Sequence, residues 1–184
     1  MTSEGREPGV VNPQGVRLDD LRRGHFHGRL ATVAQELFDD AGDDDYETFC
    51  AVIVVSGLAC DAAAGCVLGW FLEIDARRPE PRLSPGQTRR LRELLRSKKS
   101  VNLKPKSQRA VWEALSADRL GRWPDWIRYV RCVDRRNSIL HEGVLPSRRL
   151  PDRADAVEAL QVMHSLHAHL TEVLQDDPLV RHVV

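Results

Sequence analysis

The chain has no excess of charge of either sign, and its few cysteines are not arranged as in a metal site or a disulfide framework. Its 184 residues contain 27 Lys and Arg against 27 Asp and Glu. The net charge of +0 therefore excludes a general affinity for polyanions. No two cysteines form a C-x-x-C pair, and the four of them are Cys50, Cys60, Cys66 and Cys132. They are typical of buried thiols in a reducing compartment, which predicts a cytoplasmic protein.

The first residues also lack the apolar core of a secretory signal. The stretch "MTSEGREPGVVNPQG", residues 1–15, is predicted to be a flexible tail. The remaining residues, 16–184, are enough to bury one core and are predicted to form a single domain.

One apolar run is long enough to span a bilayer. It covers residues 50–72, "CAVIVVSGLACDAAAGCVLGWFL". Asp61 lies at its centre, where a charge costs about 2.5–3.5 kcal/mol on insertion scales. The run is therefore interpreted as a buried helix rather than a membrane span.

Charge is unevenly distributed along the chain. Residues 36–47 contain seven acidic side chains and no basic ones, whereas residues 77–109 contain twelve basic and two acidic ones. Such a basic stretch predicts a positive face that contacts an RNA backbone, although a merely solvated face is the alternative. It has no aromatic residue until Trp112, so base stacking is not expected there. The candidate RNA-binding residues are Arg89, Arg90, Lys98, Lys99, Lys104 and Lys106.

Helical periodicity runs through nearly the whole chain, with no strand alternation and no internal repeat. In the first segment Leu30, Val33 and Leu37 recur at helical spacing, which predicts its packed face. The fold class is therefore all-α, a single-domain bundle of about five to six helices. The predicted helices cover residues 17–40, 45–76, 86–99, 105–120, 123–143 and 152–174.

The helix at 123–143 carries the motif of greatest interest, "RRNSILHEG". Its apolar stripe is predicted to include Asn137, where an apolar residue would be expected: Trp126, Val130, Val133, Asn137 and Leu140. His141 follows Asn137 by four residues and shares its face. Arg136 and His141 are five residues apart, about 140° around an α-helix, so one helix alone directs them differently.

The specificity of this motif depends on its asparagine. A bare R-x4-H pattern is expected about once by chance in a chain of this composition. It does recur, at Arg22 and His27. Because the chain has only three asparagines, requiring one directly after the arginine lowers the chance expectation to roughly 0.015.

"RNSILH" resembles the R-N-x-x-x-H signature of HEPN domains. The resemblance rests on six to nine residues and on the order of the helices. It implies an all-helical homodimer that cleaves RNA without a metal or other cofactor, leaving a 2′,3′-cyclic phosphate and a 5′-hydroxyl. It implies Arg136, Asn137 and His141 as the catalytic set. It also implies a toxin or defence-system effector, with an antitoxin or other defence-system protein as partner.

The residue types fit this chemistry. An imidazole moves protons near neutral pH, and a guanidinium matches phosphoryl oxygens. No convincing set of metal ligands is found, since His164 and His167 are more typical of packed or interfacial histidines. The alternatives are an ordinary helix end, with arginine facing solvent and Gly143 as its stop, or a HEPN-like module that binds RNA, a nucleotide or a protein without cutting. A third is a purely structural helical adaptor.

A second signal lies in the apolar helix. Gly57, Asp61, Gly65 and Gly69 recur every four residues, which predicts a stripe where another helix approaches closely. If Asp61 is buried, it needs a cationic or hydrogen-bonding partner. Arg136 is the candidate partner, because an ion pair with Asp61 would hold its guanidinium in place. Asp61 and Arg135 are therefore predicted to be supporting residues of the site. Arg135, Arg131 or a backbone group is the structural alternative.

Overall fold

The computed structural model describes residues 28–97 and 101–177. These residues contain six α-helices, one 3-10 turn and no strand, which confirms the predicted all-α bundle. The predicted tail at 1–15, the start of the first predicted helix at 17–27, and Lys98 and Lys99 lie outside the described residues. The elements are α2 (Gly28–Asp40), α3 (Tyr46–Asp75), α4 (Pro85–Arg96), α5 (Lys106–Ser116), η2 (Leu120–Arg122), α6 (Trp126–Glu142) and α7 (Arg153–Asp176).

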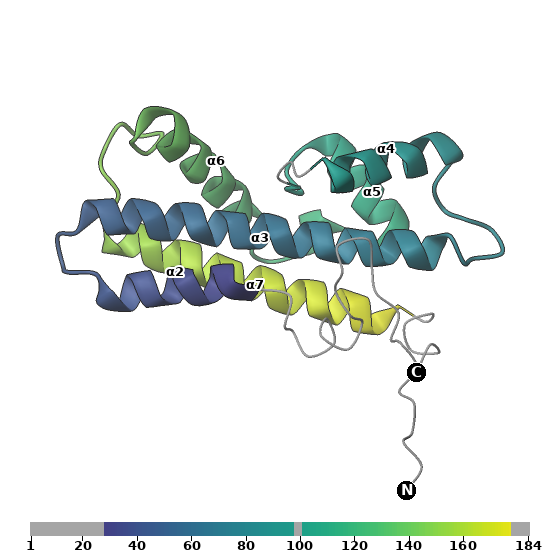
Figure 1. Cartoon of the computed structure of the whole chain (residues 1–184), viewed down its shortest axis with the longest axis horizontal. Helices are drawn as coiled ribbons and strands as arrows, with labels where there is room; N and C mark the ends of the chain where they lie inside the picture. The colour runs from purple at the N-terminus through teal and green to yellow at the C-terminus, as the bar shows by residue number, and fades with distance from the viewer. Residues whose placement is uncertain (1–27, 98–100, 178–184) are drawn as a thin grey trace, which may run out of the picture.

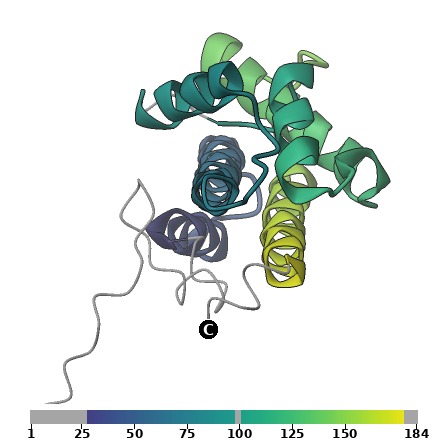
Figure 2. The ribbon, with the colours of Figure 1, turned by 90° about the vertical axis from the view of Figure 1, so that its right-hand side faces the viewer.

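Helix α3 is the central element of the bundle and contacts each of the other five helices. Figure 1 shows α2 and α7 along one side of α3, with α6 over its first half and α4 and α5 over its second half. The end-on view in Figure 2 shows these helices arranged around α3. Helix α3 therefore follows directly after the acidic turn, and both the motif helix α6 and the basic helix α4 pack on it.

The composition of α3 explains this central position. Its first turn is capped by Asp45, whose carboxylate accepts a hydrogen bond from the Thr48 N–H at 3.0 Å. Its many alanines and glycines let neighbouring helices approach closely. By length and composition it passes as a membrane span, with a mean hydropathy of 2.1, yet 72% of that apolar window is buried by the rest of the protein. This burial agrees with the interpretation of α3 as a core helix.

The predicted packed face of the first helix is confirmed only at Leu37, which is partly buried against the core. Leu30 and Val33 are exposed, whereas Ala31 and Ala34 are buried against α3. Small side chains on this face let the two backbones come close, and the larger ones are displaced to the flank. Helical periodicity thus predicted the helix, but it did not identify the face that Ala31 and Ala34 bury.

Helix α6 ends at the predicted glycine, but it begins at Trp126 rather than at the predicted residue 123. Asp125 precedes its first turn, and Gly143 follows its last with φ +72°, donating its N–H to the Ile139 carbonyl at 2.9 Å. The left-handed conformation at Gly143 is one that glycine adopts without steric cost. The glycine thus ends the helix two residues after His141.

Candidate functional site

The buried face of α6 differs from the predicted stripe. Arg136 is almost fully buried, Asn137 is half-buried, and Leu140 is 57% exposed. The stripe through Asn137 and Leu140 was therefore wrong, and so was the alternative in which Arg136 faces solvent. A charged residue can occupy this core position because a buried carboxylate forms an ion pair with it.

That carboxylate is Asp61 of α3. The Arg136 and Asp61 side chains are 5% and 4% exposed, and Nη1 of the guanidinium forms a buried ion pair with Oδ2 of Asp61. Nη1 also donates to the Gly57 carbonyl at 3.3 Å. The structure thus pairs Asp61 with Arg136, the partner predicted for it.

Gly57 makes room for this arginine. A Cβ atom at this position would lie 2.6 Å from Cδ and 3.3 Å from Cγ of Arg136. Contacts below 3.0 Å are essentially never seen for real Cβ atoms. The predicted close approach along the glycine stripe is confirmed here, and the residue that approaches is Arg136 itself.

Burial shapes the protonation of the groups around this pair. Desolvation raises the pKa of Asp61, and the adjacent guanidinium opposes that rise by favouring the carboxylate. Desolvation also raises the pKa of Tyr129 and of Cys60, and the charge on Asp61 adds to both shifts. The thiol and the phenol are therefore neutral at physiological pH.

The arginine also orients Asn137. Nε and Nη2 of Arg136 both donate to the amide oxygen of Asn137, at 3.2 and 3.1 Å. With its oxygen held in this way, the amide group has its two N–H donors available on the opposite side. The buried ion pair thereby fixes a hydrogen-bond donor at the surface of α6.

His141 lies on the same face of α6, one turn beyond Asn137. It is exposed, in the last turn of the helix. Within one chain the structure therefore brings Asn137 and His141 onto a common surface, while Arg136 points into the core. Arg136 and His141 do not meet around a single ligand in the monomer.

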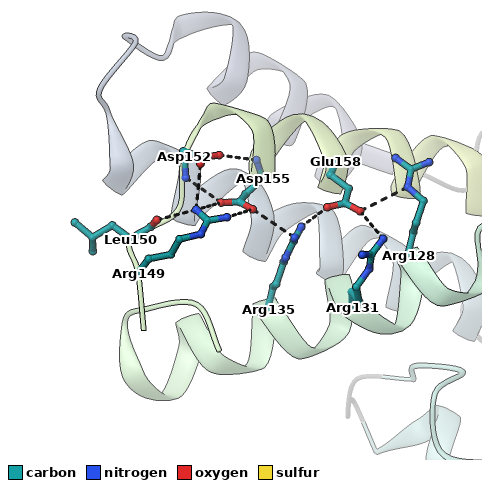
Figure 3. A network of polar contacts seen from close by, with 8 residues as sticks. All are labelled: Arg128, Arg131, Arg135, Arg149, Leu150, Asp152, Asp155 and Glu158. Carbon is teal, nitrogen blue, oxygen red and sulfur yellow. Dashed lines mark hydrogen bonds and ion pairs between the residues drawn. The ribbon is translucent and has the colours of Figure 1, made fainter. Parts of the chain in front are cut away.

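Arg135 serves a different contact from the one predicted. Figure 3 shows that it points to α7, where Nη1 lies 2.5 Å from Glu158 Oε2 and Nη2 lies 3.5 Å from Asp155 Oδ1. Arg149 also binds Asp155, with its two terminal nitrogens 2.7 and 2.8 Å from the two carboxylate oxygens. Arg135 therefore holds α6 on α7 and makes no contact with Asp61.

The predicted RNA-binding residues fall into separate groups. Arg89 and Arg90 are exposed on α4, and Lys106 is exposed at the start of α5. Lys104 instead forms an ion pair with Asp134 of α6. Sequence analysis missed this pair, and no spacing rule could have found it because the two residues are far apart in the chain.

The segment that carries Lys104 is tied to α6 by a second contact. The Leu103 N–H donates to the Tyr129 hydroxyl at 2.9 Å in the core. Residues 103 and 104, just before α5, are therefore attached to the motif helix.

Within the described part of the chain, no group of three or more His, Cys, Asp or Glu side chains is placed to hold a metal ion. His167 is buried, with Nε2 3.4 Å from the Ala59 carbonyl, as expected for a packed histidine.

Comparison with family models, with curated proteins and with solved structures gives no match for this chain. The likeness to HEPN domains therefore remains a prediction carried by Arg136, Asn137 and His141.

Proposed function

We propose that the protein is a cytoplasmic, metal-independent endoribonuclease that works as a homodimer, in the role of a toxin or defence-system effector restrained by a partner protein. The observation that carries the proposal is the Asn137–His141 surface. A buried, charge-paired arginine orients the amide there, and the imidazole stands one turn away. A helix end that takes no part in chemistry does not need a buried ion pair to orient its surface side chains.

The reaction uses the 2′-hydroxyl of RNA as nucleophile. One imidazole removes the proton from this hydroxyl while the 2′-oxygen bonds to phosphorus, and the bond to the 5′-oxygen breaks. An imidazolium supplies the proton to the leaving oxygen, so the products are a 2′,3′-cyclic phosphate and a 5′-hydroxyl. His141 of the two copies serves as base and acid. The Asn137 amide donates to the phosphoryl oxygens as charge builds on them.

Arg136 acts in this proposal mainly by positioning. Four of its N–H groups are engaged inside the chain, by Asp61, by the Gly57 carbonyl and twice by Asn137. Its role is therefore to hold Asn137 and to place a positive charge behind it, rather than to grip phosphate with the whole guanidinium fork.

The test is cleavage of a synthetic RNA by the wild-type chain, by His141→Ala and by His164→Ala as a control. Both histidines are exposed on helices, so neither change should alter the melting temperature much. We expect His141→Ala to abolish cleavage and His164→Ala to retain it. Full cleavage by His141→Ala would refute the assignment.

Three further experiments test the mechanism. A substrate with 2′-deoxyribose at the scissile position should resist cleavage, since it lacks the nucleophile. EDTA should leave the activity intact, and loss of activity that a divalent ion restores would contradict the metal-independent route. Heterodimers of the wild-type chain with His141→Ala should lose nearly all activity, because the shared site needs an imidazole from each copy.

The second candidate is a non-catalytic module that binds RNA, a nucleotide or a protein. The observation that favours it is the enclosure of Arg136, which leaves little of the guanidinium for a transition state. In that case the wild-type chain would bind RNA and His141→Ala would bind it equally well, with no cleavage by either.

A further inference from the structure

A mostly apolar pocket lies between α4 and α5, on the half of α3 that the motif helix does not cover. Its volume is about 390 Å³, within the range of small-molecule sites in proteins. Figure 1 shows α4 and α5 together over the second half of α3, and all three helices contribute to the walls. The aliphatic side chains among them are Leu68 of α3, Leu91 and Leu94 of α4, and Val111 of α5. This α4–α5 pocket therefore suits a flat or compact apolar group.

One polar side chain in the wall of this pocket lacks a hydrogen-bond partner. Gln108 is half-buried on α5, and its amide oxygen Oε1 is buried and accepts no hydrogen bond. Buried polar atoms are nearly always paired, so an unpaired one in a pocket wall indicates a partner supplied from outside. The last torsion of a glutamine side chain is broad, so the amide can turn its oxygen or its N–H groups toward the pocket. We therefore expect a ligand that carries a hydrogen-bond donor beside its apolar body.

The rim of the pocket is basic. Arg90 lines it from α4, is exposed, and makes no ion pair with any residue that the structure describes. Helix α4 has four arginines and a single acidic residue, Glu93. Arg89, Arg92 and Arg96 line a second depression, on the opposite flank of the helix. The guanidiniums thus continue from the pocket rim across the outer face of α4, an arrangement that matches successive phosphates better than a single one.

Adenine joined to a phosphate is the ligand chemistry that meets these three features. Its ring system is flat, and its N6 amino group and N7 atom are the donor and acceptor that a glutamine amide binds in a bidentate way. Adenine is also the common base that has no carbonyl oxygen, so burial against aliphatic walls leaves no strong acceptor unpaired. A fatty acid would match the walls and Arg90, but it would leave the Gln108 oxygen without a donor.

We propose that the α4–α5 pocket binds one adenine base of an RNA strand whose phosphates follow the arginines of α4. Gln108 determines the preference for adenine, and Arg90 binds the adjacent phosphate. Apolar side chains can hold an unstacked base as aromatic ones do, so the lack of aromatic residues in this basic stretch is no obstacle. The continuing row of arginines favours a strand over a free nucleotide. The proposal rests on the proposed function in taking RNA as the ligand, but it does not depend on cleavage.

The place of the pocket along α3 sets which nucleotide is recognised. Leu68 follows Gly57 by eleven residues, and Gly57 packs against Arg136 of the motif. At 1.5 Å per residue the pocket is therefore about 16 Å from the motif along α3. The adenine that it binds is not part of the bond that is cut but lies further along the same strand. Base recognition and chemistry are thus carried by different helices.

The experiment is fluorescence anisotropy of the full chain with short 2′-O-methyl oligonucleotides, which lack the nucleophile, so binding is measured without cleavage. The probes are uridine strands with one central adenine, one central purine base without the amino group, or neither. We expect the wild-type chain to bind the adenine strand about tenfold or more tightly than the other two. Gln108→Leu should remove this preference without lowering the melting temperature, because it replaces an unpaired buried amide by an apolar side chain. Gln161→Leu, at an exposed position of α7, is the matched control and should keep the preference.

Two more variants separate the base from the backbone. Arg90→Gln should weaken the binding of all three strands alike and keep the adenine preference. Ala110→Phe, at an exposed position of the pocket wall, should fill the pocket and abolish the preference, and it replaces Gln108→Leu if that chain is less stable.

Three results would overturn the proposal: no binding of any strand, equal affinities for the adenine and purine strands, or a preference that survives both pocket variants. Binding of AMP that depends on Gln108, with no adenine preference among the strands, would place a free nucleotide in the pocket and overturn the assignment to RNA. An adenine preference in a chain that cleaves no RNA would support the pocket and contradict only the proposed nuclease activity.

Discussion

Replacing Gly57 by alanine should destabilise the protein, although alanine is the better helix former. A glycine inside a helix costs about 1 kcal/mol relative to alanine, so the change alone would stabilise α3 by that amount. Against this gain, the new Cβ would lie 2.6 Å from Cδ of Arg136. The arginine cannot easily move aside, because Asp61 and Asn137 hold its guanidinium. Overpacking of this kind typically costs about 1–3 kcal/mol.

Moving the arginine would also strain a buried ion pair, whose loss costs about 3–5 kcal/mol when one partner remains. The clash therefore outweighs the helix propensity. With the propensity gain of about 1 kcal/mol subtracted from an overpacking cost near the upper end of its range, we expect Gly57→Ala to lower the free energy of unfolding by about 1–2 kcal/mol.

The sign should reverse when the arginine is absent. In an Asp61→Ala/Arg136→Ala background the clashing Cδ and Cγ are gone, and the remaining atom, Cβ of residue 136, would lie 3.4 Å from the new methyl. That distance is an ordinary contact. Gly57→Ala should then stabilise the protein by about 1 kcal/mol. Both charges are removed together because a lone buried carboxylate would dominate the measurement.

Urea unfolding followed by far-UV circular dichroism measures all four proteins, with Gly65→Ala as the control. A Cβ at Gly65 would meet Val101 Cβ at 3.5 Å, so that change should have the same small effect in both backgrounds. An effect of Gly57→Ala with the same sign in both backgrounds would refute the reasoning.

Three further outcomes are expected. Asp61→Ala should lower the free energy of unfolding by about 3–5 kcal/mol, and Asp61→Ala/Arg136→Met should recover most of it; a cost near zero for the single change would contradict the buried pair. The pKa of Asp155 is lowered. Burial disfavours its charged form, but its hydrogen bonds and the neighbouring arginines favour that form by more. Its stabilising effect is therefore present above the ordinary value of 3.8 and lost as pH falls below it. Asp155→Asn should cost about 1–3 kcal/mol at neutral pH and little in strong acid, as urea unfolding at several pH values would reveal. Arg89→Glu/Arg90→Glu should weaken RNA binding and make the slope of log affinity against log salt shallower by about 2, whereas an unchanged slope would identify a merely solvated face.

The sequence by itself determined the fold class and the position of the motif helix. Strong helical periodicity and the lack of strand alternation predicted the bundle. Gly143 marked the end of α6, because a glycine in the left-handed conformation acts through local backbone geometry. Asp61 stood out as a charge inside an apolar run, which any burial would force to find a partner.

Tertiary structure decided which arginine pairs with Asp61 and which faces of the helices pack in the core. Arg135 and Arg136 are adjacent and chemically identical, and the apolar stripe predicted for this helix contained neither of them. The choice depends on α3, where Asp61 offers a counter-charge and Gly57 leaves space for the arginine stem. That choice rotates α6, which leaves Asn137 and His141 at the surface. Contacts between residues some 75 positions apart set this orientation, and the local sequence of either helix does not contain them.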